Sequence, residues 1–169
     1  MGAQLPPRSP TSRLRRRKVL MVRISAVCAV ATLALSSTAA AQDRVARGEY
    51  LVESIAGCGN CHTPHLPDGS LDESMALAGA FVIEEPVFKA YAKNITPDME
   101  TGIGSWSEDD IVKALREAVR PDGKILGPPM SFHFYNKLSD NDAYAIAAYL
   151  KTVRPIRNMV GHETNEVFF

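Results

Sequence analysis

Cysteine and histidine are scarce in this chain of 169 residues, and their scarcity excludes several kinds of site. There are three cysteines and four histidines. Cys28 lies in an apolar stretch near the N-terminus, so the rest of the chain has only Cys58 and Cys61. One pair cannot build the framework of several disulfides that stabilises many small exported proteins. A structural zinc site needs four ligands, and the histidines after His62 lack the close spacing that would complete one.

Acidic residues are absent from residues 1–41, which contain seven Lys or Arg side chains. All 19 acidic side chains therefore lie in residues 42–169, against 12 basic ones, so this part carries a net charge of −7. A basic head, then an apolar run, then an acidic body predicts a leader followed by a soluble protein. The negative charge disfavours nucleic acid as a partner, and it favours weak, salt-sensitive association with basic surfaces.

Long hydrophobic runs are also lacking. The longest uncharged apolar stretch, "ISAVCAVATLAL" at 24–35, falls short of the roughly 20 residues that a membrane-spanning helix needs. Basic residues precede it, and the small residues Ala39 and Ala41 follow it. This pattern is typical of a secretory signal peptide. An uncleaved membrane anchor is the alternative.

The expected organisation is therefore a signal peptide over residues 1–41, cleaved after Ala41, and one domain over residues 42–169. The true start is Met1 or Met21, because the sequence from Met21 onward is already an adequate signal. We expect the mature chain to be periplasmic, either soluble or attached peripherally to a membrane.

The motif Cys58-Gly59-Asn60-Cys61-His62 has four possible uses: a dithiol redox site, half of a zinc site, a disulfide, or covalent attachment of haem. A redox dithiol would sit in a βαβ pattern, which the surrounding sequence lacks. In haem attachment, two thiols at this spacing bond the porphyrin and the adjacent imidazole ligates its iron. The sequence thus predicts one haem c bound through Cys58 and Cys61. His62 should ligate the iron and donate its other ring nitrogen to a backbone carbonyl; Pro64 and Pro67 are the candidate acceptors.

Three helices are predicted from apolar periodicity. The first covers 43–57, with an apolar face of Val45, Tyr50 or Leu51, Val52 and Ile55, and with Gly48 at a close approach to another helix. The second starts after Ser107 as N-cap, buries Ile111, Ala114, Leu115 and Ala118, and ends near 121–123. The third runs from Ser139 as N-cap to Pro155 and buries Ala143, Ile146, Ala147, Leu150 and Val153. Residues 63–105 contain turn-forming residues and short apolar runs that predict no definite element.

The segments "NITPDMETGIGSWSEDDIVKALREAV" (94–119) and "LGPPMSFHFYNKLSDNDAYAIAAYL" (126–150) carry a family resemblance. They resemble the bacterial cytochrome c family found in the haem subunits of periplasmic alcohol and gluconate dehydrogenases, and the likeness covers about 45–158. It implies an all-α class I cytochrome c fold, with three main helices and long loops wrapped round one covalently attached haem. Multi-haem members carry three such domains, whereas this chain has one motif and the length of one domain.

The sixth iron ligand decides whether such a protein carries electrons or binds small molecules. Met130 follows the stiff segment Gly127-Pro128-Pro129, and the resembling family places its ligand methionine just before the last helix. We therefore expect His62 and Met130 as the iron ligands. The alternatives are His133 and the other methionines: Met75, Met99 and Met159.

The resemblance also implies that Asn94, Thr96 and Trp106 lie beside the haem, where they could bond its propionates. The simpler alternative is that Asn94 caps a turn and Trp106 packs in the core.

No acid–base pair or nucleophilic constellation stands out in the rest of the sequence, so we expect an electron carrier and not an enzyme, either diffusing freely or bound as the electron-transfer subunit of a dehydrogenase complex. The resemblance implies a periplasmic dehydrogenase as electron donor and an oxidase or another cytochrome as acceptor. The alternative is a haem-based sensor or peroxidase with an open or displaceable sixth site.

Overall fold

The first long helix within the described residues ends shortly before the cysteine motif. The computed structural model describes residues 41–86, 88–161 and 166–168, so the predicted signal peptide lies outside the described residues except for Ala41. Residues 41–50 are α-helical, and the chain continues as a π-helical turn, η1 (Leu51–Ile55). Gly57, with φ of +58°, turns the chain into the short helix α2 (Gly59–His62).

The π-helical turn changes which side chains face the core. Leu51 and Val52 are buried, as predicted, but Ile55 is 66% exposed and Tyr50 points outward. A π-turn bonds residue i to i+5 and so adds a residue to the turn. The prediction for Ile55 was wrong because it assumed an unbroken 3.6-residue period through the end of this helix.

The second predicted helix is α3 (Glu108–Glu117), and its start is confirmed. The Ser107 hydroxyl accepts from the Asp110 amide, and the Asp110 carboxylate accepts from the Ser107 amide, which satisfies two donors at the helix start. The predicted apolar face is buried in full. The helix ends at Glu117, a few residues before the predicted turn, because Ala118 has a left-handed conformation.

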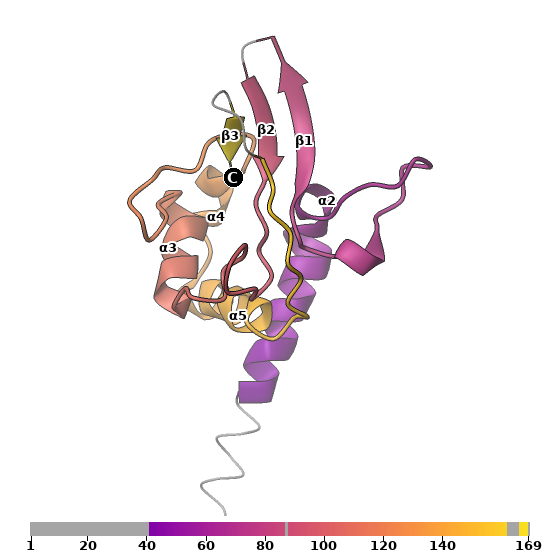
Figure 1. Ribbon diagram of the computed structural model, residues 1–169. Helices are drawn as coiled ribbons and strands as arrows, with labels where there is room; N and C mark the ends of the chain where they lie inside the picture. Colours follow the sequence, from indigo (N-terminus) through magenta and orange to yellow (C-terminus); the bar gives the residue numbers. More distant parts are fainter. Residues whose placement is uncertain (1–40, 87, 162–165, 169) are drawn as a thin grey trace, which may run out of the picture. The chain divides into compact units, whose positions relative to one another are not determined.

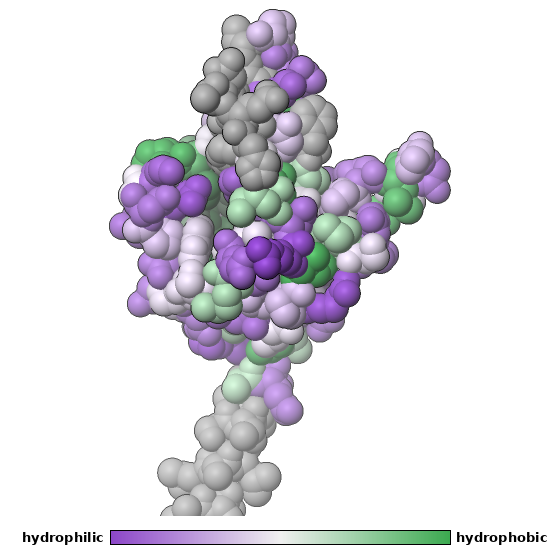
Figure 2. Space-filling view, viewed as in Figure 1, coloured by the Kyte–Doolittle hydropathy of each residue, from purple (hydrophilic) through white to green (hydrophobic). Residues whose placement is uncertain are grey.

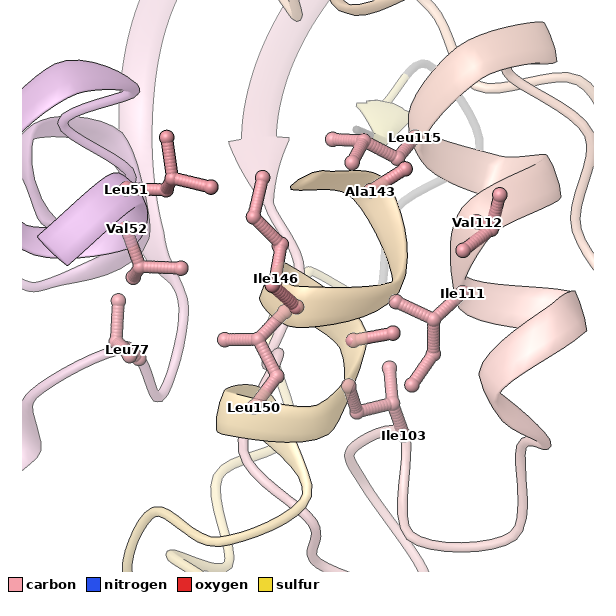
Figure 3. Close-up of a cluster of buried hydrophobic side chains, with 12 residues drawn as sticks. Leu51, Val52, Leu77, Ile103, Ile111, Val112, Leu115, Ala143, Ile146 and Leu150 are labelled. Atoms are coloured by element: carbon pink, nitrogen blue, oxygen red, sulfur yellow. The ribbon is translucent and has the colours of Figure 1, made fainter. Parts of the chain in front are cut away.

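The third predicted helix, α5 (Asp140–Leu150), packs between the other two (Figure 1). Ser139 caps it as predicted, although it ends at Leu150 and leaves Val153 half-buried beyond it. Figure 3 shows Ile146 and Leu150 between Leu51 and Val52 of η1 on one side and Ile111 of α3 on the other. The predicted close approach at Gly48 is also confirmed, because a Cβ there would lie 2.0 Å from the Ala145 carbonyl oxygen of α5.

A small sheet departs from the predicted all-α chain. Strands β1 (Ala80–Glu85) and β2 (Phe88–Ala92) form an antiparallel hairpin with an irregular register near Phe81, and β3 (Glu166–Phe168) pairs in parallel with β2. The hairpin comes from the short apolar runs of residues 63–105. Runs of this length do not distinguish strand from helix by periodicity alone, which is why the sequence analysis missed it.

Two further short helices complete the fold: η2 (Glu73–Met75) and α4 (Phe132–Tyr135). Hydrophilic side chains cover most of the face seen in Figure 2, and the hydrophobic areas between them are small. In the described residues, no helix combines the length and the apolar character that crossing a bilayer requires.

Candidate functional site

A cavity of about 540 Å³ opens among side chains of α2, α3, α5 and the loops between them. This volume is within the range of pockets that hold small molecules and cofactors. The site residues predicted from the sequence all line this cavity: Cys58, Cys61, His62, Asn94, Trp106 and Met130. The fold therefore brings together residues from three separated segments of the chain.

The two cysteines reach the cavity from the start and the third position of a short helical segment. Cys58 is the N-cap of α2, and its carbonyl accepts from the amides of Cys61 at 3.3 Å and His62 at 2.9 Å. Both thiols are free, not joined in a disulfide. Burial, assisted by the negative charge of Glu53, raises the pKa of the Cys58 thiol to about 12, so this thiol is uncharged at neutral pH.

His62 is buried, and its ring orientation is set by the backbone of a distant segment. Its Nδ1 donates to the Lys93 carbonyl oxygen at 2.7 Å, because a carbonyl can only accept. Burial lowers the pKa of His62, while this hydrogen bond acts in the opposite direction. The neutral imidazole thus carries its proton on Nδ1 and its lone pair on Nε2, the arrangement that a metal-ligating histidine needs.

The predicted kind of bond is confirmed, but the predicted acceptors are wrong. Neither proline carbonyl accepts from His62; the Pro64 carbonyl accepts from the Asp72 amide instead. The hairpin explains the difference, since it contacts His62 at both of its ends. The Gly79 amide, just before β1, donates to the His62 carbonyl at 2.7 Å, and Lys93 follows β2 directly. A strand pair that local periodicity did not reveal therefore holds the histidine.

Met130 lies where three groups of apolar side chains meet. It packs against the main core, against Ala90 and Ala92 of β2, and against a cluster of Ala118, directly after α3, and Leu126, beyond the following turn. Its side chain is half-buried in the cavity wall. Packing on several sides leaves such a side chain little conformational freedom to lose on binding a ligand.

The other sulfur and imidazole candidates are placed differently. Met99 and Met159 also line the cavity, but they are 68% and 57% exposed. His133 is exposed, lies outside the cavity wall and contacts the rings of Phe132 and Phe134. Met75 is also absent from the cavity wall.

The amide group of Asn94 is bonded within the protein at each of its hydrogen-bonding positions. Its Nδ2 donates to Thr101 Oγ1 at 3.0 Å and to the Ile156 carbonyl at 2.7 Å. Its Oδ1 accepts from the amide and the hydroxyl of Thr96. Asn94 and Thr96 are both buried, and they join the loop after β2 to the segment after α5. This is the turn-capping arrangement considered from the sequence, on a residue that also lines the cavity.

Trp106 is half-buried and packs against the main core and the Ala118–Leu126 cluster. A lysine at the end of α5 fixes the loop that carries it. Lys151 Nζ donates to the carbonyls of Gly104 at 2.7 Å and Trp106 at 2.8 Å. The ammonium group thereby satisfies carbonyls that this turn of the chain leaves without amide partners.

Sequence reasoning missed two further polar side chains in the cavity wall. Arg120 lies there with a buried Nε that has no hydrogen-bond partner, while its NH2 group pairs with Asp122 at 3.2 Å. Tyr135 lies there with its hydroxyl bonded to the Ala56 carbonyl. Tyr135 lies within the 126–150 segment that carries the family resemblance and Arg120 lies just after the 94–119 segment, but the spacing of neither residue carried a functional signal.

The described residues do not support the zinc alternative. Among them, no group of three or more His, Cys, Asp and Glu side chains is arranged to hold a metal ion. The sulfur and imidazole groups are instead distributed around a mainly apolar cavity.

The chain matches no protein-family model but has clear relatives among characterised proteins. It is 37% identical to the cytochrome c subunit of a quinone alcohol dehydrogenase from Gluconobacter oxydans over 134 residues, which are 76% of this chain and 26% of the relative. It is 39% identical to the cytochrome subunit of fructose dehydrogenase from Gluconobacter japonicus over 113 residues, 66% of this chain and 22% of the relative.

A third relative is smaller. A diheme cytochrome c-type protein of Cereibacter sphaeroides is 40% identical over 112 residues, 65% of this chain and 36% of the relative. The chain thus spans about a quarter to a third of the length of these relatives. The helices and the cavity are consistent with a cytochrome c fold, to which a small sheet is added. The chain belongs to the bacterial cytochrome c family that includes these dehydrogenase subunits.

Proposed function

We propose that this chain is a periplasmic monohaem cytochrome c that carries single electrons from a dehydrogenase towards an oxidase or another cytochrome. The observation that carries the proposal is the meeting of Cys58, Cys61, His62 and Met130 on one cavity. The first three come from one motif, but Met130 comes from a distant segment. A motif that arose by chance would have no reason to share a cavity of cofactor size with a methionine from a distant segment.

The residues present fit a haem in three ways. Two free thiols and a neutral imidazole with its lone pair on Nε2 line the cavity, as covalent attachment and iron ligation require. Apolar side chains, including Ile111, Leu115 and Ile146, supply walls that suit a porphyrin face. The unpaired, buried Nε of Arg120 suits an anionic group such as a propionate.

The residues have distinct roles in this proposal. Cys58 and Cys61 hold the haem covalently, and His62 and Met130 ligate its iron. A bound haem supplies one-electron oxidation and reduction. The bond from His62 to Lys93 orients the imidazole and raises its basicity. Met130 is favoured over Met99 and Met159 because it is packed on several sides, whereas those two are more than half exposed.

Asn94 and Trp106 have supporting roles in this proposal. A propionate bond to Asn94 would have to replace one of its protein partners, so we assign Asn94 to shaping the loop beside the haem. Trp106 would pack against the haem edge from the same loop.

The proposed donor and location rest on the relatives and the charge of the chain. Two of the relatives are named as cytochrome subunits of alcohol and fructose dehydrogenases, so a dehydrogenase is the proposed electron donor. The net charge of −7 over residues 42–169 favours partners with basic docking surfaces. The predicted signal peptide supports the periplasm, the compartment in which these residues would meet their haem.

The test is an optical spectrum of the full chain expressed with a haem-attachment system, oxidised and reduced, with and without carbon monoxide. We expect a low-spin spectrum, a weak red band from the iron–methionine bond, no change with carbon monoxide, and haem that survives acid–acetone extraction. Met130→Ala should abolish the red band and admit carbon monoxide. Met99→Ala and Met159→Ala are the matched controls and should change neither.

Two outcomes would contradict parts of the proposal. Extractable haem in the wild-type chain would refute covalent attachment. A high-spin wild-type spectrum with ready carbon monoxide binding would refute Met130 ligation and favour a ligand-binding sensor or a peroxidase.

A further inference from the structure

Tyr135 connects the segment that carries Met130 to the segment that carries Cys58. It is the last residue of α4, a few residues after Met130. Its hydroxyl donates to the Ala56 carbonyl oxygen at 3.2 Å, across 79 positions of the sequence. Ala56 ends the π-helical turn η1 and lies just before Cys58. The bond therefore joins two segments of the cavity wall, one that would supply the attachment site and one that would supply the sixth ligand.

The acceptor lies at a point where the backbone needs a partner. The last carbonyls of a helix have no amide partner within the helix. After Ala56 the chain turns at Gly57, and the Cys58 amide returns to the Val52 carbonyl at 3.1 Å. The Tyr135 hydroxyl supplies a donor to the carbonyl at this turn, and its ring packs against the main core.

Residues 127–135, the Met130 segment, form few other hydrogen bonds to the rest of the protein. In the described part of the chain, the Tyr135 hydroxyl makes the one hydrogen bond that links residues 127–135 to a distant segment. Pro128 and Pro129 have no amide proton to donate. The amides of Phe134 and Tyr135 bond within the segment, to Ser131. Apart from side-chain packing, one hydroxyl therefore holds this segment in register with the cysteine motif.

We propose that Tyr135 is a positioning residue that keeps the Met130 segment closed against the Cys58 segment. By doing so, it limits how readily a small molecule displaces Met130 from the iron. This inference rests on the proposed function, in which Met130 is the sixth ligand. It adds a determinant of ligand exchange that lies outside the ligand set.

The test is imidazole binding to the oxidised, haem-loaded full chain, followed by absorbance. Tyr135→Phe keeps the ring and removes the hydroxyl. Losing one neutral hydrogen bond amounts to roughly a fivefold change in an equilibrium constant, so the Kd for imidazole should fall about fivefold. Tyr149→Phe is the matched control, because the Tyr149 hydroxyl also bonds to η1, at Glu53 Oε1, but comes from α5. Its imidazole Kd should equal that of the wild type.

A double-mutant cycle separates positioning from a general loss of structure. In a Met130→Ala background there is no sulfur ligand to displace, so Tyr135→Phe should leave the imidazole Kd unchanged. An equal effect in both backgrounds would overturn the inference, as would a wild-type Kd in Tyr135→Phe. An equal fall in Kd in Tyr149→Phe would overturn it too, since any loosening of η1 would then suffice.

The two proposals can fail separately. If the wild-type chain lacks the red band, Met130 ligation is wrong and the role of Tyr135 falls with it. If the band is present and Tyr135→Phe leaves the imidazole Kd unchanged, only the role of Tyr135 is refuted.

Discussion

Gly48 offers the sharpest test of how the 41–50 helix, which leads to the cysteine motif, packs on α5. It is buried where the 41–50 helix crosses α5. A Cβ at this position would lie 2.0 Å from the Ala145 carbonyl oxygen, 2.6 Å from the Ala145 carbonyl carbon and 2.7 Å from Tyr149 Cβ. Carbon atoms pack at about 3.5–4.0 Å, so Gly48→Ala must push the two helices apart by more than about 1 Å. None of these three atoms can be moved by rotating a side chain.

Two opposing effects decide whether Gly48→Ala raises or lowers the free energy of unfolding. Helix propensity favours alanine over glycine by about 1 kcal/mol. Overpacking a well-packed contact costs about 1–3 kcal/mol and occasionally more, and a backbone obstacle belongs at the upper end. We therefore expect Gly48→Ala to lower the free energy of unfolding by about 2 kcal/mol, whereas propensity alone predicts a gain of about 1 kcal/mol.

The assay is urea unfolding of the haem-loaded chain, followed by far-ultraviolet circular dichroism. Ala46→Gly is the control, because Ala46 is exposed on the same helix; it should lose about 1 kcal/mol through propensity. A Gly48→Ala protein at least as stable as the wild type would refute the close approach of these helices. Because this helix leads directly to Cys58, the variant should also broaden or weaken the red absorption band.

Three further predictions concern stability. Asn94→Ala removes a buried amide with four protein partners and should cost about 2–4 kcal/mol in urea unfolding, because several of these partners are left unsatisfied. Ser107→Ala removes the capping box of α3 and should cost about 1 kcal/mol in the same assay. Hydrogen bonds from Thr101 are the chief reason why the pKa of Asp98 lies below its ordinary value. The ionised Asp98 therefore contributes to the free energy of unfolding above about pH 4, and this contribution is lost as the pH falls towards the folded-state pKa. When urea unfolding is measured across that pH range, the free energy of unfolding of Asp98→Asn should fall less steeply with falling pH than that of the wild type.

Exposed positions serve as controls for these changes. Asn141→Ala, at an exposed position of α5, should change stability by less than about 0.5 kcal/mol. A loss that small in Asn94→Ala would contradict the buried network. If Ser107→Ala unfolds at the same urea concentration as the wild type, the capping box makes no measurable contribution to stability. If the stability of Asp98→Asn falls with pH as steeply as that of the wild type, other carboxylates dominate acid unfolding.

Features that depend on neighbours within a few residues were predictable from the sequence. The N-caps at Ser107 and Ser139 each act on an amide three residues on, so the pattern and the structure contain the same information. The buried faces of α3 and α5 follow from the 3.6-residue period in the same way. The cysteine motif is local for a similar reason, because the spacing of its thiols is a property of five consecutive residues.

Hydrogen-bond and packing partners that lie far apart in the sequence were determined only by the tertiary structure. His62 bonds to Lys93 because a hairpin returns there, and the Tyr135 hydroxyl donates to the Ala56 carbonyl across 79 positions of the sequence. The residue types at these positions are compatible with many partners, since any carbonyl accepts equally well. A glycine inside a predicted helix indicated that Gly48 would meet another helix, but not that Ala145 would be the residue it meets. A sequence pattern can thus specify which groups need a partner, whereas chain topology selects the partner, because that choice depends on every element packed between the two.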